Sequence, residues 1–98
     1  MNIRKWRWSR HYESSEEELL ALFDARRISA TRHKAEAMEA PNALVTTADK
    51  RIWLAEGSAT AELGHQRFSL QPGDTIDLPT GTGYQITAGI SGCVWYES

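Results

Sequence analysis

The sequence predicts a mainly β protein, a small barrel or sandwich with one helix before it. Two observations predict this class. Short runs of alternating apolar and polar residues fill the second half of the chain, and turn residues separate them at intervals of roughly 8–12 residues. The clearest run is 75–78, held between the turn dipeptide Pro72-Gly73 and the glycine pair Gly81 and Gly83.

The helix is predicted near residues 15–26. Either Ser14 or Ser15 can cap it, because a glutamate follows each serine three positions later. Acidic residues at its start and Arg26 and Arg27 at its end both suit the helix dipole. Leucines and a phenylalanine fall on one face, which predicts that this face is buried.

The strands are predicted from alternation and from the turns between them. The segment 35–40 has high helix propensity, but the later pattern is all β, so 29–39 is assigned as a strand. The expected strands are 29–39, 43–47, 51–56, 59–63, 68–70, 75–78, 85–87 and 93–96. The expected turns are 41–42, 48–50, 64–65, 72–73, 79–83 and 89–92.

The length of 98 residues suits a single domain, with an arm and helix over 1–28 and a barrel over 29–98. A net charge of −2 gives no reason to expect nucleic acid or an anionic membrane as partner. The basic residues around Trp6 and Trp8 are better explained by a packed arm than by nucleic-acid contact. A single cysteine, Cys93, excludes an internal disulfide, and neither a signal peptide nor a membrane span is visible, so we expect a cytoplasmic protein.

Glycine and proline spacing in the 73–84 stretch resembles the second sequence motif of the cupin superfamily. Gly73, Pro79 and Gly81 match that motif, whereas Tyr84 stands at its histidine position and Ala88 at its asparagine position. The resemblance covers roughly residues 29–97 and implies a double-stranded β-helix, or jelly-roll, barrel.

The first cupin motif is matched more weakly. Gly57 resembles its terminal glycine, which places Lys50 at the glutamate position. The paired histidines are then replaced by Leu44 and Thr46, or by Ala43 and Val45 with a longer spacer.

Metal binding in cupins uses three histidines and one acid, and those positions carry no such set here. Of the remaining histidines, His65 lies in a predicted turn and His11 precedes the helix, while His33 could point inward. One histidine does not make a site. We therefore expect neither a metal nor a cofactor.

Tyr84 and Lys50 are the candidate site residues, because both are expected to face the barrel cavity. Thr46, Ile86 and Leu54 complete the predicted ligand-binding set. Acid–base chemistry would need the tyrosine pKa lowered by the lysine, or the lysine pKa lowered by burial. The alternative is that Tyr84 fills the barrel and Lys50 lies in a solvated turn.

Three further residues could act as catalytic groups. Cys93 is expected to be a buried structural thiol rather than a nucleophile. Asp74 is expected to serve the turn after Pro72-Gly73, and Asp77 to lie on the outer face of its strand.

The tryptophans predict where the sheet is covered. Trp53 alternates with Ile52 and Leu54, which are placed inward, so Trp53 is expected on the outer face beneath the helix or a second subunit. Resemblance to small cupins also implies a homodimer.

Three functions follow. The first is a metal-free barrel that binds a small molecule or a partner. The second is a metal-independent isomerase, epimerase or lyase acting on a small sugar-like or acid substrate. The third is a structural interaction protein with a packed barrel.

Overall fold

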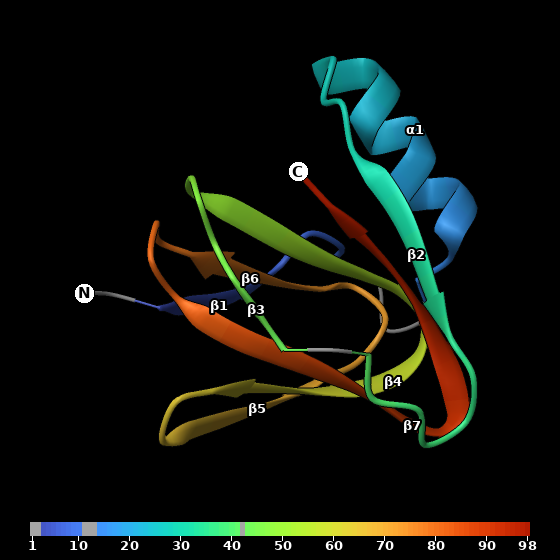
Figure 1. Ribbon diagram of the computed structural model, residues 1–98. Helices are drawn as coiled ribbons and strands as arrows, with labels where there is room; N and C mark the ends of the chain where they lie inside the picture. Colours follow the sequence, from blue (N-terminus) through green and yellow to red (C-terminus); the bar gives the residue numbers. More distant parts are fainter. Residues whose placement is uncertain (1–2, 11–13, 42) are drawn as a thin grey trace.

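A computed structural model describes residues 3–10, 14–41 and 43–98, and two long strands organise it (Figure 1). Strand β4 (Lys50–Leu63) and strand β7 (Gly83–Glu97) run antiparallel over most of their length. Ile52 pairs with Glu97 at one end of the pairing, and Glu62 pairs with Gln85 at the other.

The remaining strands extend this central pair in two directions, all antiparallel. The first half of β4 and the second half of β7 lie in the order β1-β6-β4-β7-β2, where β1 is Arg4–Arg7, β6 is Asp74–Leu78 and β2 is Thr31–Ala35. At the opposite ends, β5 (Gln66–Leu70) pairs with β4, and β3 (Leu44–Val45) pairs with β7. One layer of the barrel is β1-β6-β4-β7-β2, and the second contains β5, β3 and the other halves of β4 and β7. The two long strands therefore belong to both layers.

The interior of the barrel is filled mainly by side chains that alternate inward along β4, β6 and β7. Ile52 and Leu54 from β4 meet Ile76 and Leu78 from β6, all at most 1% exposed. Their inward direction confirms the alternation read from the sequence. The other buried members are Ala35, Ala59, Ala61, Leu63, Leu70, Tyr84, Ile86, Ala88, Cys93 and Trp95.

A second apolar cluster lies on the outer face, between the sheet and helix α1 (Glu16–Arg26). Trp53 is fully buried there, with its ring 5.1 Å from Phe23 in an edge-to-face arrangement. Trp6 and Trp8 of the N-terminal arm pack against the same cluster. The helix, rather than a second subunit, covers Trp53, and the arm lies on its own sheet as expected.

Helix α1 begins and ends where its sequence predicts. The Ser15 hydroxyl accepts a hydrogen bond from the backbone N–H of Glu18 at 3.2 Å, which makes Ser15 the N-cap. Arg27 follows the helix in the left-handed conformation, with φ 55°. Among the residues described, no helix is long and apolar enough to cross a bilayer.

Several strand boundaries differ from the sequence prediction. The expected strand 29–39 is confined to 31–35, with a turn at 37–38, and the expected strand 43–47 is confined to 44–45. The expected turn at 89–92 is wrong: 85–87 and 93–96 form one strand, β7. Likewise 51–56 and 59–63 merge into β4. His11 and Asn42 lie outside the described residues.

Glycines explain why these strands continue. Gly57 and Gly92 adopt positive φ (74° and 75°) in the middle of the β4–β7 pairing, next to a register shift between Gly57 and Ala59. A Cβ on Gly57 would lie 2.1 Å from the Gly92 carbonyl oxygen. The glycines thus permit a bend and a close backbone approach within a strand, not a reversal of the chain.

Candidate functional site

The Glu97 carboxylate lies at the end of the barrel where the start of β4 meets the end of β7. Lys50 Nζ donates to Oε1 at 2.9 Å and the Tyr84 hydroxyl donates to the same oxygen at 3.3 Å. Trp95 Nε1 donates to Oε2 at 3.0 Å, and His33 Nε2 lies 3.7 Å from it. We call these five residues the Glu97 cluster.

Three separate strands supply the Glu97 cluster. Its members meet because each occupies an inward-facing position on its strand. Lys50 is the first residue of β4, and β7 contributes Tyr84 at its start and Trp95 and Glu97 at its end. His33 of β2 pairs with Trp95, and their rings stack with centroids 5.3 Å apart and planes 13° from parallel. The Glu97 side chain is only 9% exposed.

Burial alone would raise the pKa of Glu97. Hydrogen bonds from Trp95 and Lys50 and the nearby charges of His33 and Lys50 outweigh this effect and lower it below 4.5. Hydrogen bonding to Glu97 in turn raises the pKa of Lys50. A carboxylate that faces an ammonium group and an indole N–H is the charged form that the cluster stabilises.

Tyr84 is both a core residue and a member of the cluster. It is 5% exposed and packs with Leu78 and Ile86 in the core, while Lys50 Nζ lies 5.9 Å from its ring centroid. Burial and the Glu97 charge raise its pKa, and the smaller effect of Lys50 does not reverse this. The directions that acid–base use of this pair would need are therefore opposite to those found.

The other predicted binding residues are buried away from solvent. Leu54 and Ile86 are 0% and 4% exposed within the core. Thr46 is 3% exposed and closes a loop: its hydroxyl donates to the Pro79 carbonyl and accepts from the Thr82 N–H. Of the five residues predicted from the sequence, the structure brings Lys50 and Tyr84 together. The other three are buried in the core or in a loop and do not contact the Glu97 carboxylate through a hydrogen bond in the described structure.

The four positions that hold a metal in cupins do not fit one here. Leu44 carries no donor atom, and the Thr46 hydroxyl is already used. Lys50 is held in its charged form, and Tyr84 in its neutral form. Within the described ranges, no group of three or more His, Cys, Asp or Glu side chains is arranged to hold a metal ion.

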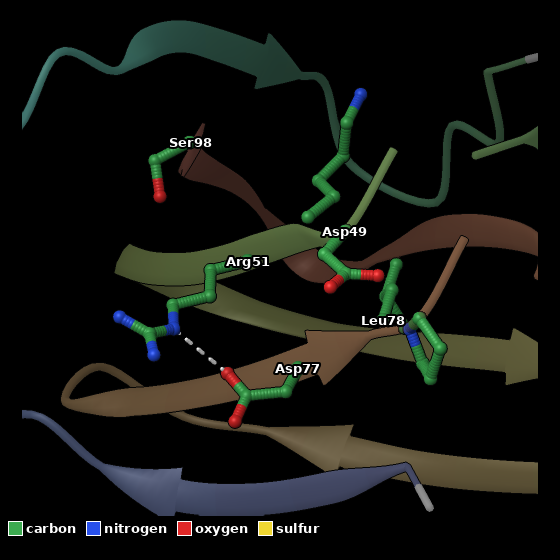
Figure 2. A pocket seen from close by; sticks show the side chains of 7 residues that line it. Asp49, Arg51, Asp77, Leu78 and Ser98 are labelled. Carbon is green, nitrogen blue, oxygen red and sulfur yellow. Dashed lines mark hydrogen bonds and ion pairs between the residues drawn. The ribbon is translucent and has the colours of Figure 1, made fainter. Parts of the chain in front are cut away.

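A groove of ≈ 420 Å³ opens beside the cluster, and Lys50 belongs to both. Its lining residues come from the start of β4, the end of β6 and the end of β7: Asp49, Lys50, Arg51, Asp77, Leu78, Pro79 and Ser98. Figure 2 shows Arg51 reaching toward Asp77, with Asp49, Leu78 and Ser98 around them. The volume lies within the range of small-molecule sites.

Asp74, Asp77 and Cys93 have the surroundings that the sequence predicts. Asp74 is buried, accepts from the Gln71 N–H at 2.8 Å and pairs with Arg7 at 3.1 Å, as the predicted turn residue should. Asp77 lies on the outer face of β6. Cys93 is buried, and burial raises its thiol pKa from 9.0 to about 11, so little thiolate forms at neutral pH.

Sequence reasoning missed Glu97, Trp95 and the groove residue Arg51. One signal was available, since Glu97 and Trp95 have the same parity as the inward Cys93. The pairing of Ile52 with Glu97, which brings Lys50 near this carboxylate, is a tertiary contact that no local pattern contains.

Solved structures with this architecture include a cupin superfamily protein from Desulfitobacterium hafniense, with a TM-score of 0.65 at 11% identity over 98% of this chain and 74% of that one. A DUF861 family protein from Thermotoga maritima gives 0.61 at 9% identity over 99% and 98%. Salicylate 1,2-dioxygenase from Pseudaminobacter salicylatoxidans gives 0.64 at 14% identity over 70% and 20%.

The chain spans only part of several similar structures, 59% and 61% of the length of two further proteins and 20% of the dioxygenase. No protein-family model and no curated protein matches the sequence. Identities this low establish the fold and carry no activity with them. The chain has a cupin-like β-barrel fold.

Proposed function

We propose that this barrel binds a small polar molecule, without a metal, in the groove beside the Glu97 cluster. The observation that carries the proposal is the ≈ 420 Å³ groove opening onto Lys50, whose ammonium group is fixed by Glu97 at 2.9 Å. Both cationic donors and carboxylate acceptors line it, and Leu78 and Pro79 add an apolar surface. Such a lining suits a ligand that carries both hydrogen-bond donors and acceptors.

The test is a small-molecule screen observed by ¹H–¹⁵N NMR on the intact chain. A binding compound should shift backbone amide signals of 49–51 and 77–78, and Lys50→Ala should weaken it by about tenfold, the cost of one charge-assisted hydrogen bond. Arg67→Ala, at an exposed ion pair on the distant β4–β5 hairpin, is the matched control. Compounds that shift only signals outside the groove would refute the proposal.

The metal-free part of the proposal has its own measurement. Protein purified without chelators should contain no stoichiometric iron, zinc, manganese or nickel by elemental analysis. One tightly bound metal per chain would overturn this part.

An isomerase, epimerase or lyase is the second candidate, since Tyr84 and Lys50 share one carboxylate oxygen of Glu97. At neutral pH the raised pKa values leave both groups protonated, and the lowered pKa of Glu97 leaves a weak base. The cluster therefore supports binding better than proton abstraction. Retained turnover of any candidate substrate by Tyr84→Phe would remove this tyrosine from catalysis.

The packed interior favours an interaction protein only if the groove stays empty in the screen.

We also propose a cytoplasmic homodimer. Exposed apolar residues near β3 and the bend of β7 support a second copy as the partner, namely Met38, Leu44, Val45 and Ile90, which are 53–84% exposed. Light scattering should give about twice the chain mass of 11.0 kDa, and the monomer mass would contradict the dimer.

A further inference from the structure

Outside the barrel, three neighbouring strands place two arginines on either side of one carboxylate. Arg4 of β1 and Arg51 of β4 both pair in register with Asp77 of β6. Side chains at directly paired positions lie on the same face of a sheet, so Arg4, Asp77 and Arg51 form one row across its outer surface. The formal charge of this row is +1.

Asp77 and two tryptophans fix the orientation of Arg51. Its Nε donates to Asp77 Oδ1 at 3.0 Å, and the Trp6 indole N–H donates to the same oxygen at 3.1 Å. The Arg51 guanidinium carbon lies 5.5 Å from the Trp6 ring centroid and 6.0 Å from that of Trp53. A guanidinium that is held by an ion pair and lies against two aromatic rings loses little further freedom when it binds a ligand.

The opposite edge of the Arg51 guanidinium is available to a ligand. Asp77 takes the Nε edge, and the Arg51 side chain is 51% exposed. The Nη edge presents two parallel N–H donors, which is the geometry that a carboxylate or phosphate accepts. In Figure 2 this edge points away from Asp77.

Arg4 adds a second positive charge on the same side. Its guanidinium carbon lies 6.0 Å from the centroid of the Trp6 ring, the ring that also contacts Arg51. Both cations therefore flank one indole, next to the groove that Arg51 and Asp77 line.

We infer that Arg51, positioned by Asp77 and Trp6 and assisted by Arg4, is an oxyanion subsite of the groove. The ligand is then a small polar molecule with a terminal carboxylate or phosphate on this outer row, and its polar body lies beside Lys50. This inference rests on the proposed groove function and specifies the ligand class.

The experiment uses matched fragments with the intact chain. Glycolate and methyl phosphate are titrated beside the neutral glycolamide, and amide shifts at 49–51 and 77–78 are followed by NMR. Both acids, or one of them, should bind at least about tenfold more tightly than glycolamide, the difference expected for a bidentate charged contact. The stronger of the two acids identifies carboxylate or phosphate as the natural group.

Three variants complete the test. Arg51→Gln should remove the preference for the acids and Arg4→Gln should reduce it, whereas Arg67→Gln should leave it unchanged. Arg4→Gln keeps the Arg51–Asp77 ion pair, so it remains informative if Arg51→Gln unfolds. Groove binding of glycolamide as tight as that of the acids overturns the inference alone. Absence of groove shifts with every fragment refutes the inference and also counts against the proposed function.

Discussion

At the scale of the residue, Glu97 joins the start of β4 to both ends of β7 through one carboxylate. Its side chain is 9% exposed and accepts from Lys50, Tyr84 and Trp95. Removing it would leave an ammonium group, a hydroxyl and an indole N–H without their acceptor at a partly buried position. The cost of such a change exceeds that of losing a surface ion pair.

Glu97→Ala should therefore lower the free energy of unfolding by about 2–3 kcal/mol, measured by urea denaturation. Glu62→Ala is the matched control, because Glu62 also accepts from a cation on its sheet but is 37% exposed. The control should cost no more than about 1 kcal/mol. Equal losses in the two variants would show that the Glu97 cluster adds nothing special.

At the scale of the element, the bend in the middle of the paired strands β4 and β7 depends on glycine for two separate reasons. Gly57 has positive φ and no room for a Cβ, whereas Gly64, at φ 63°, has nothing within 4 Å of a built Cβ. The two positions thus separate backbone conformation from close approach.

Gly64→Ala should cost about 1 kcal/mol, the price of a left-handed alanine. Gly57→Ala should cost more than about 3 kcal/mol or prevent folding, because the Gly92 carbonyl must move as well. Thermal denaturation by circular dichroism compares the pair. Similar melting temperatures would mean that the backbone around Gly92 can move to accommodate the added methyl group.

Helix α1 is attached by few large side chains. Phe23 is 6% exposed and contacts Trp53 and Tyr96 edge to face, while Leu20 on the same helix is 46% exposed. Phe23→Ala should cost about 3 kcal/mol and red-shift tryptophan emission, and Leu20→Ala less than about 1 kcal/mol. Unchanged emission in Phe23→Ala would mean that the helix does not shield Trp53.

These elements also show what sequence could predict. The cap at Ser15, the helix and the parity of Ile52, Trp53 and Leu54 follow from local patterns, because each depends on neighbours a few residues away. The merging of the predicted strands into β4 and β7 does not follow from local patterns, since a glycine in a bend resembles a glycine in a turn. The Glu97 cluster cannot be predicted locally either, because pairing between strands distant in sequence creates it.

At the scale of the whole molecule, ionisation sets a window of stability. The pKa values of Glu97 and Glu16 are lowered in the folded state, so their contribution is present above about 4.5 and is lost as pH falls through the folded values. The raised pKa of Cys93, from 9.0 to about 11, leaves stability unaffected below 9 and reduces it above, where only the unfolded thiol ionises.

Unfolding free energy should therefore be highest between about pH 5 and 9 and fall on both sides. Urea titrations across this range provide the measurement. Glu97→Gln should flatten the acid limb, and Cys93→Ala the alkaline limb. An acid limb that is identical in Glu97→Gln would assign it to other carboxylates.

The pairing of Ile52 with Glu97 also has a consequence for how the chain is made. Strand β4 cannot complete its sheet, nor β2 find its partner, until the last residues of β7 have been synthesised. Until those residues pair, the apolar face of β4 lacks its neighbouring strand, so the barrel closes late in folding. Contacts this distant in sequence are typical of domains that fold in milliseconds to seconds.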